Sequence, residues 1–480
     1  MQLASLPKQK MLLFFWIFLF IAVSGFGQSY HAIHGSSYTG ATSIFNNPAS
    51  PVNSSKKWDL NLFAFQLGNS TNSLVINGAE FPPLTAYSIN LTKGSQRRWL
   101  HQNMDINLMN AMYKLSDKHS ISVGLRMRTY NHIHTEPVHL RETFTTLRDF
   151  LIDNRSLPGL QGTMTHSFWA EGDINYSRVL QENNAGKLSG GITLQIMKNI
   201  SGGYVKINKL MAKEYILPTD TIYGIADGYG SYAYSANYDE TLVGTNTQSN
   251  SNSLLKNAKK SVGISLGIEY LVYDQESDVS EGETKPYSWK FGASLMDIGS
   301  NNFNTGTYTG QFSQPKTALN NWDIENKLMG ITASNELKDS LATMFNSVKA
   351  LPATFKIGSP TRLTLNVDRN LGNHFYINGG ISLNLKSTSK FTKQNLREFN
   401  LITVTPRWET LLFGLYLPVQ YNSQGQLWAG AAVKLGPLVA GIHNLGIFKK
   451  EPSLSGGGYI MFSIYPIKKS RIRTRLDCRE

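Results

Sequence analysis

Hydrophobic and polar residues alternate with a period of two along much of this chain. The clearest runs are SISVGLRMRTY (120–130), SVGISLGIEYLVY (261–273) and HFYINGGISLNLK (374–386). In each run one face is apolar, and the other carries Gly and Ser with single charged side chains. This period is typical of a β-strand whose two faces meet different surroundings. Strands of roughly ten residues can cross a bilayer at a tilt, whereas globular strands average about half that length.

Fourteen such segments predict an all-β fold, a single closed transmembrane antiparallel β-barrel spanning residues 57–466. On its strands, the side chains expected to face lipid include Leu125, Ile264, Leu266, Ile381 and Leu383. The segments lie near 57–68, 103–115, 120–132, 166–180, 187–198, 260–273, 287–298, 356–368, 374–386, 398–407, 411–421, 426–435, 437–444 and 455–465.

The lengths of the connections fit the sidedness of outer-membrane barrels. The three largest insertions, at 133–165, 199–259 and 299–355, all fall at one end of the predicted barrel, and the short turns fall at the other. Barrels of the outer membrane have long extracellular loops and short periplasmic turns. Residues 69–102 fit either a hairpin outside the wall or two additional strands.

Two of the long insertions have helical periodicity, near 138–152 and 320–350. The first repeats Leu at 140, 147 and 151, with Phe144, before Pro158. The second lies between a cap at Ser334 and a stop at Pro352, and its apolar positions are Leu337, Leu341, Met344, Phe345 and Val348. These apolar stripes either pack within the loops or offer a surface to a ligand or partner.

The first predicted strand differs from the rest, because aromatic residues occupy its second face. Trp58, Leu60 and Leu62 alternate with Asp59, Asn61, Phe63 and Phe65. If the first set faces lipid, Phe63 and Phe65 face the lumen and need an apolar partner there.

The N-terminus indicates export. Lys8 and Lys10 precede the apolar run MLLFFWIFLFIAVS, and small residues follow it, which is typical of a signal peptide over 1–27. The single cysteine, Cys478, excludes an internal disulfide framework. A composition with 41% hydrophobic residues, 11% aromatic residues and 41 glycines is too polar for a helical membrane protein. The expected location is the bacterial outer membrane.

The formal net charge of +13 is concentrated in part at the C-terminus. Residues 467–480 are predicted to form a basic periplasmic tail, either solvated or bound to an acidic partner. Nucleic acid is not expected as a partner of an exported chain.

Motifs of known enzymes are missing from the sequence. It has no G-x-S-x-G elbow, H-E-x-x-H pair, P-loop or dinucleotide fingerprint. NHIHTEPVH brings together His132, His134, Glu136 and His139, which could be solvated or could ligate a metal. No catalytic residue, metal or cofactor is predicted.

Two short motifs support a family resemblance. FNNPAS (45–50) before the first strand and GASLMDIGS (292–300) in the middle of the barrel resemble elements of FadL/OmpP1-type and PorV-like outer-membrane barrels of the Bacteroidetes, and most closely those of the uncharacterised DUF5723 group. The resemblance implies an outer-membrane barrel with a transport or accessory role. Only about 29 residues separate the signal peptide from the first strand, fewer than the hatch of the fatty-acid transporters.

Residues 28–56 are predicted to form a short plug that enters the lumen. The turn at Asn47, Pro48 and Ala49 would pack on the wall, and Phe45 would pack against Phe63 and Phe65. A plain linker is the alternative. The candidate plug and lumen residues are Phe45, Asn47, Pro48, Ala49, Phe63, Phe65, Arg126, Arg128, Glu269, Lys290 and Asp297.

The function predicted first is a conduit for a small molecule, with a hydrophobic one as an option. The alternative is an accessory barrel that interacts with subunits of a type IX-like secretion system, and an outer-membrane enzyme ranks third. The expected partners are outer-membrane lipid with either a hydrophobic small molecule or secretion-system subunits; the oligomeric state stays open. A continuous path through the lumen would favour transport, and a sealed lumen with apolar outer loops would favour the accessory role.

Overall fold

The structure of this protein is a computed structural model. It describes residues 31–77, 88–141, 146–216, 218, 221–241, 255–256, 258–274, 286–317, 319–329, 331, 334–386, 394–448 and 455–466. The predicted signal peptide and basic tail lie outside these residues.

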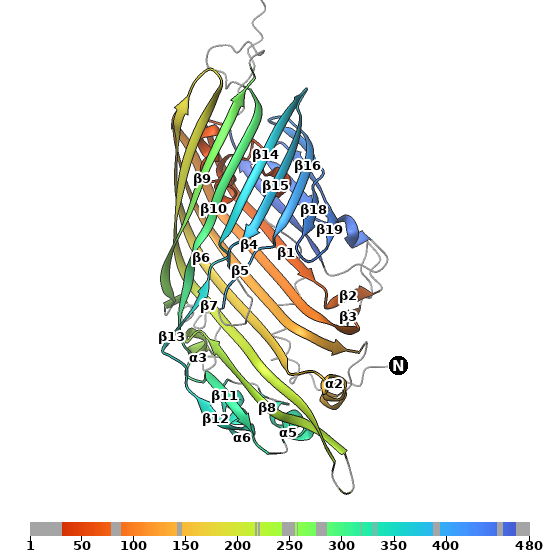
Figure 1. Cartoon of the computed structure of the whole chain (residues 1–480). Helices are drawn as coiled ribbons and strands as arrows, with labels where there is room; N and C mark the ends of the chain where they lie inside the picture. Colours follow the sequence, from red (N-terminus) through yellow and green to blue (C-terminus); the bar gives the residue numbers. More distant parts are fainter. Residues whose placement is uncertain are drawn as a thin grey trace, which may run out of the picture.

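The described strands close into one antiparallel barrel with fourteen wall positions (Figure 1). Closure occurs at β1, which pairs with β4 on one side and with the last strand, β22, on the other. In order around the wall the positions are β1 (Trp58–Thr71), β4 (Gly94–Ser116), β5 (His119–Leu140), β6 (Leu160–Glu182), β7 (Gly186–Ile216), β9 (Lys259–Tyr273), β10 (Tyr287–Asn304), β13 (Thr354–Gly358) with β14 (Arg362–Gly372), β15 (Phe375–Asn384), β16 (Leu401–Glu409), β17 (Phe413–Tyr416) with β18 (Val419–Asn422), β19 (Leu427–Ala429) with β20 (Ala431–Leu435), β21 (Leu438–Ile442) and β22 (Gly456–Ile464). The prediction of a fourteen-stranded barrel is confirmed.

Three wall positions consist of two short strands in line. β13 and β14 both pair with β10, and β17 and β18 both pair with β16. Pro360 lies in the first interruption and Pro418 in the second. A proline has no N–H to donate to a neighbouring strand, so the ladder stops locally while the wall continues.

Several strands are much longer than predicted. β4, β5 and β6 have 22 or 23 residues and β7 has 31. About ten residues suffice to cross the membrane, so these strands continue well beyond it. Alternation is lost in the distal half of β7, where most side chains are partly exposed, and this is why the sequence pattern ended the strand near residue 198.

The protruding part of the barrel carries an additional sheet. Beyond the end of β9, β7 pairs with β8 (Thr221–Tyr234), followed by β11 (Gly310–Pro315) and β12 (Phe345–Lys349). These strands and the helices lie at the end of the barrel opposite the β6–β7 turn (Figure 1). The helices are α2 (Leu147–Asn154), α3 (Asn237–Thr241), α5 (Asn321–Leu328) and α6 (Ser334–Met344). We call this the long-loop end, and the other the short-turn end.

The helical insertions differ in extent from those expected. Leu140 ends strand β5, and the first described helix starts at Leu147; Phe144 lies outside the described residues. The helix that begins at Ser334 stops at Met344, so Phe345 and Val348 belong to β12. The apolar stripes pack within the loops in a cluster of buried residues: Ile225, Tyr232, Phe312, Leu319, Ile324, Leu341, Met344 and Phe345.

A two-stranded hairpin occupies the connection between β1 and β4. It pairs β2 (Leu74–Asn77) with β3 (Ser88–Leu91) in a sheet separate from the wall. Of the two options for residues 69–102, the structure therefore has the hairpin, with residues 94–102 added to β4.

Burial in this barrel is inverted relative to a soluble protein. The five side chains expected to face lipid are between 38% and 51% exposed in the isolated chain, whereas Arg126, Arg128 and Glu269 are at most 4% exposed. Apolar residues on the outer surface and charged residues inside are typical of a wall surrounded by lipid. No helix in the described segments is long and apolar enough to cross a membrane.

A β-bulge explains why large apolar side chains occupy both alternating sets of positions in the first strand. The register of β1 against β22 shifts between Asn61 and Phe63, and a bulge of this kind reverses the side-chain alternation beyond it. Asp59, Asn61, Ala64 and Gln66 are buried, whereas Phe63 is 42% exposed and Phe65 is partly exposed. The expectation that Phe63 and Phe65 line the lumen is therefore wrong.

A charge on the outer face should destabilise the barrel according to its depth. We expect Leu266→Lys, in the middle of β9, to lower the free energy of unfolding in lipid vesicles by about 2–4 kcal/mol. Leu115→Lys is the control, because Leu115 is exposed next to the β4–β5 turn and should cost only about 0–1 kcal/mol. Urea titration of both variants in vesicles measures the difference, and equal costs would contradict the assigned membrane depth.

Candidate functional site

The residues that precede β1 lie inside the barrel at its short-turn end. Residues 31–56, here called the plug segment, contain three short 3-10 helices: η1 (His31–Ile33), η2 (Gly40–Phe45) and η3 (Ser50–Asn53). Nearly every described side chain of η2 and η3 is buried. The segment appears in red between the wall strands (Figure 1). It packs on the wall through loops and turns, and does not add a strand to the sheet.

The Asn47–Ala49 turn is tied both to itself and to the wall. The Asn47 Oδ1 atom accepts from the Ala49 N–H at 2.9 Å, and its Nδ2 donates to the Ile268 carbonyl at 2.9 Å. Asn175 Nδ2 donates to the Pro48 carbonyl at 3.0 Å. Because Pro48 has no N–H, the turn leaves fewer donors to satisfy in a closed space.

Wall glycines make room for this turn. A Cβ atom at Gly191 would lie 2.0 Å from the Pro48 carbonyl oxygen, and one at Gly267 would lie 2.0 Å from Asn47 Oδ1. Both contacts are closer than any real Cβ contact allows. The plug segment therefore occupies a space that the wall leaves open by lacking side chains.

Wall charges hold the rest of the segment. Glu269 accepts from Ser50 Oγ at 2.7 Å and from Asn53 Nδ2 at 2.8 Å. Lys290 Nζ donates to Ser37 Oγ at 3.3 Å, and Ser36 Oγ donates to Glu409 at 2.8 Å. Burial, and after it the charge of Lys290, lowers the pKa of His34 to about 4, so its imidazole is neutral at neutral pH.

Phe45 has partners other than the ones expected. Its ring lies under the Arg126 guanidinium, whose central carbon is 4.1 Å from the ring centroid. Its backbone carbonyl accepts from Arg362 Nη2 at 3.2 Å. Phe45 is buried, but against two arginines and not against Phe63 and Phe65, which the bulge turns outward. Cation–π contact explains how an aromatic ring fits into a polar lumen.

A buried ionic layer crosses the lumen next to Phe45. Asp297 accepts from Arg128 Nη1 at 2.9 Å, from Arg362 Nη1 at 2.9 Å and from Gln195 Nε2 at 2.9 Å. Arg126 Nε donates to Glu171 at 2.6 Å. The layer comprises Asp105, Arg126, Arg128, Glu171, Asp297, Arg362 and Glu398, with side chains at most 7% exposed.

The backbone at Asp297 is bent to aim its carboxylate inward. Asp297 has φ = 55°, in the left-handed region, at a register shift between β10 and β9. Its N–H donates to Ser265 Oγ, and its carbonyl accepts from Thr361 Oγ1. A non-glycine residue adopts this conformation at a cost, which the surrounding contacts must offset. Asp297 of the GASLMDIGS motif is thus the central acid of the ionic layer.

An apolar layer lies beyond the ionic layer, toward the long-loop end. It is formed by Tyr130, Trp169, Met197, Phe303, Ile357 and Leu396, all at most 3% exposed. Leu396 comes from the loop between β15 and β16, whose neighbouring residue Glu398 accepts from the Tyr130 hydroxyl at 2.5 Å. The loop therefore folds into the lumen, where Glu398 and Leu396 join the two layers.

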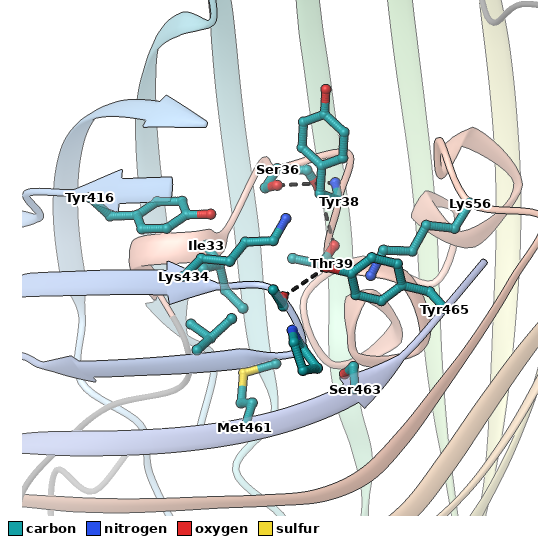
Figure 2. Close-up of a pocket in the computed structure, with 13 residues that line it drawn as sticks. Ile33, Ser36, Tyr38, Thr39, Lys56, Tyr416, Lys434, Met461, Ser463 and Tyr465 are labelled. Carbon is teal, nitrogen blue, oxygen red and sulfur yellow. Dashed lines mark hydrogen bonds between the residues drawn. The ribbon is translucent and has the colours of Figure 1, made fainter. Parts of the chain in front are cut away.

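A small cavity remains between the plug segment and the closing strands. Its volume is about 20 Å³, room for one water molecule on the usual scale. Figure 2 shows Tyr38, Thr39 and Ile33 of the plug segment facing Lys434, Met461 and Tyr465 of the wall and its end. Most of its lining surface is apolar, although lysine and tyrosine side chains contribute to it, and it is too small for an organic ligand.

Sequence reasoning missed several members of the ionic layer. Glu171 and Arg362 lie on strands whose side chains alternate between the inward and the outward face, and both occupy inward positions. A systematic search for charged residues at inward positions would have found them. Glu398 gave no such signal, because it lies in a loop. The predicted lumen residues Arg126, Arg128, Glu269, Lys290 and Asp297 are all placed on the inward face.

The histidines of NHIHTEPVH do not assemble around a common point. His132 Nδ1 is in hydrogen-bond contact with His101 Nδ1 on β4, whereas His139 sits near the helix α2, with its N–H bonded to Asn154. Glu136 pairs with Arg97 on the surface. Among the described residues, no three or more His, Cys, Asp or Glu side chains are placed to hold a metal.

Comparison with known families identifies the chain. A model described as a family of unknown function (DUF5723) matches residues 48–442, from the plug turn to β21. The chain belongs to the DUF5723 family. The predicted family is thereby confirmed, and no curated protein matches this DUF5723 member.

Several solved structures resemble this family member over most of its length. The Ralstonia pickettii toluene transporter TbuX has 10% identity and a TM-score of 0.43, with 93% of this chain and 99% of that chain covered. The P. putida toluene transporter TodX has 9% identity and a TM-score of 0.43, covering 93% and 100%. A Pseudomonas aeruginosa FadL homologue has 10% identity and a TM-score of 0.39, covering 90% and 95%.

Removing a single arginine from the ionic layer should be costly. We expect Arg128→Met to lower the free energy of unfolding by about 3–5 kcal/mol, because Asp297 and Asp105 lose a buried partner. Arg97→Met breaks an exposed pair with Glu136 and should cost less than about 1 kcal/mol. Denaturant unfolding in detergent micelles measures both. A cost for Arg128→Met no larger than that of the control would show that the buried layer does not stabilise the barrel.

Proposed function

We propose that this DUF5723 protein is a gated outer-membrane conduit for a small molecule with an apolar part. The supporting observation is the fit between the plug segment and the glycines of the wall. Gly191 and Gly267 leave space that the Asn47–Ala49 turn of the segment fills, so withdrawal of the segment would open a passage at the short-turn end. A barrel with a purely structural lumen could fill the same space with wall side chains.

The contacts of the plug segment suit reversible closure. Most are hydrogen bonds to side chains such as Glu269, Asn175 and Lys290. Three cation–π contacts, the ion pair of Lys56 with Asp59 and a small apolar cluster around Ile33 add to them. Water can replace each hydrogen bond when the segment leaves, so a neutral bond contributes about 0.5–1.5 kcal/mol net and a bond to Glu269 or Lys290 about 1.5–3 kcal/mol. The segment is held in place by several such bonds, and none of them requires a wall strand to unpair.

The order of layers supports the proposed substrate class. A molecule entering from the long-loop end first meets the apolar layer with Trp169, Phe303 and Leu396, and then the charged groups around Arg128 and Asp297. An apolar body with a polar group would find a complementary partner in each layer. The loop that carries Leu396 and Glu398 contributes to both, which makes it the natural second barrier of the conduit. The proposed role is non-enzymatic.

The gate predicts that loss of the plug segment raises permeability. Deletion of residues 28–50 should increase single-channel conductance in planar bilayers while the barrel stays folded. Gly267→Ala should act in the same direction, because its Cβ would overlap Asn47 Oδ1. Gly380→Ala is the matched control: its Cβ would meet no atom closer than 3.9 Å, and its conductance should equal that of the unaltered protein.

The result would go against the conduit if the deletion left conductance unchanged in a folded barrel. Heat-modifiable migration in gels and far-UV circular dichroism establish the folded state. An increase that appears equally with Gly380→Ala would point to general loosening of the wall rather than to release of the plug segment.

An accessory barrel that binds secretion-system subunits is the second candidate. It is favoured by large apolar side chains projecting at the long-loop end, where Ile216, Trp322 and Met329 are 83%, 62% and 73% exposed. Unchanged conductance on plug deletion, combined with loss of a co-purifying outer-membrane subunit in Trp322→Ser, would favour this role over transport.

A further inference from the structure

Asp173 is a buried carboxylate without a hydrogen-bond partner in the described part of the chain. It lies on the inward face of β6 and is 2% exposed, yet neither of its oxygens has a hydrogen-bond partner there. Its neighbour Arg126 bonds instead to Glu171. Burying an unpaired carboxylate is costly, so this position calls for a group of positive character.

The oxygens next to Asp173 are acceptors as well. Asn110 on β4 faces Gly124 on β5, and Gly124 faces Asp173 on β6. Asn110 Nδ2 donates to Asn61 at 3.4 Å, and its Oδ1 extends over Gly124, only 2.1 Å from where a Cβ would be. Gly124 therefore leaves room for the Asn110 amide oxygen over β5, the strand between Asn110 and Asp173.

A second amide is oriented in a similar way. Asn175 lies two residues from Asp173 on the same face of β6. Its Nδ2 is fixed by the Pro48 carbonyl and by Thr193 Oγ1, whereas its Oδ1 has no partner among the described residues. Ser122, which faces Asn175 across the ladder, has a buried hydroxyl without a described partner. Three adjacent strands thus bring together one carboxylate, two amide oxygens and a hydroxyl.

The charge balance of the surrounding lumen points the same way. Asp173 and the ionic layer together hold five carboxylates, Asp105, Glu171, Asp173, Asp297 and Glu398, against three arginines, Arg126, Arg128 and Arg362. The described groups carry an excess of two negative charges if all are ionised. One divalent cation would cancel that excess.

We propose that Asp173, Asn110, Asn175 and Ser122 form a binding site for a hard, oxygen-preferring cation, with Ca²⁺ as its best match. Ca²⁺ takes carboxylate, amide and hydroxyl or water oxygens in flexible geometry. The site differs from a centre of several His, Cys, Asp or Glu ligands because it uses one carboxylate with neutral oxygens. It does not depend on whether any molecule passes through the barrel.

The position of the site gives the cation a structural partner in the plug. Asn175 offers its oxygen to the site and its nitrogen to the Pro48 carbonyl. A bound cation therefore fixes the amide that holds the plug turn, and polarises it as a stronger donor to Pro48.

Calcium titration of the full-length protein in detergent tests the site. Isothermal titration at constant ionic strength should show one Ca²⁺ bound per chain, with affinity at least about tenfold weaker in Asp173→Asn. Asn110→Ala, which keeps every charge, should weaken binding severalfold. Asp117→Asn is the control: the same acid-to-amide change in the exposed β4–β5 turn should leave affinity unchanged.

The proton is the competing explanation for the charge excess. If Asp173 is neutralised by a proton, the unaltered protein binds no Ca²⁺ and Asp173→Asn leaves the titration unchanged, which overturns the site. Equal binding in the unaltered protein and in both Asp173→Asn and Asn110→Ala would place the ion elsewhere, on the surface or in the detergent layer, and would overturn it as well. Should Asp173→Asn fail to fold, Asn110→Ala against Asp117→Asn decides the question alone.

Discussion

The buried contact of Asp297 with Arg128 and Arg362 is the interaction on which the interior of this barrel depends. It joins β5, β10 and β14 across the lumen, and Arg362 extends the connection to the Phe45 carbonyl of the plug segment. Desolvating three charges is expensive, and only close geometry with further hydrogen bonds offsets the cost. The left-handed backbone conformation at Asp297 provides that geometry. The ionic contacts that it allows offset the cost of the strained backbone.

A charged interior follows from the inverted surroundings of the wall. Apolar side chains are used on the lipid side, where they stabilise the barrel in the membrane, and polar side chains remain for the lumen. The polar contacts in the lumen can be hydrated at small net cost, because water replaces each of them, whereas the apolar layer around Trp169 and Phe303 cannot be hydrated in this way. The proposed opening of the barrel would depend on this property of the polar contacts, because an apolar core of similar size would resist opening.

The sequence was sufficient for the wall because lipid and lumen impose a strict period of two. It predicted fourteen strands, and it placed Leu266 outside and Arg128 inside. In a regular strand, whether a side chain faces lipid or the lumen depends only on whether its position is odd or even. The same rule failed at Phe63 and Phe65, where one additional residue in a bulge reverses the parity and leaves no mark in the pattern. It also failed for the strand ends beyond the membrane, where both faces of β7 meet water or loops. The pairing of Glu398 with Tyr130 joins residues 268 positions apart, and no local pattern contains that information.

The position of the plug segment in the chain restricts how the barrel can be assembled. Only residues 54–57 separate η3 from β1, and β1 is the strand that closes the ring against β22, where Asn61 Nδ2 bonds to the Phe462 carbonyl and to Ser463 Oγ. The seam thus unites the first and the last of the described wall strands, and the enclosed segment is attached directly to the first. A ring that closed first would have to admit these residues through its end, past side chains already in place. It is simpler for the plug segment to be enclosed before the ring closes. In that order the pairing of β1 with β22 forms last, and it closes the barrel around a plug segment that is already in place.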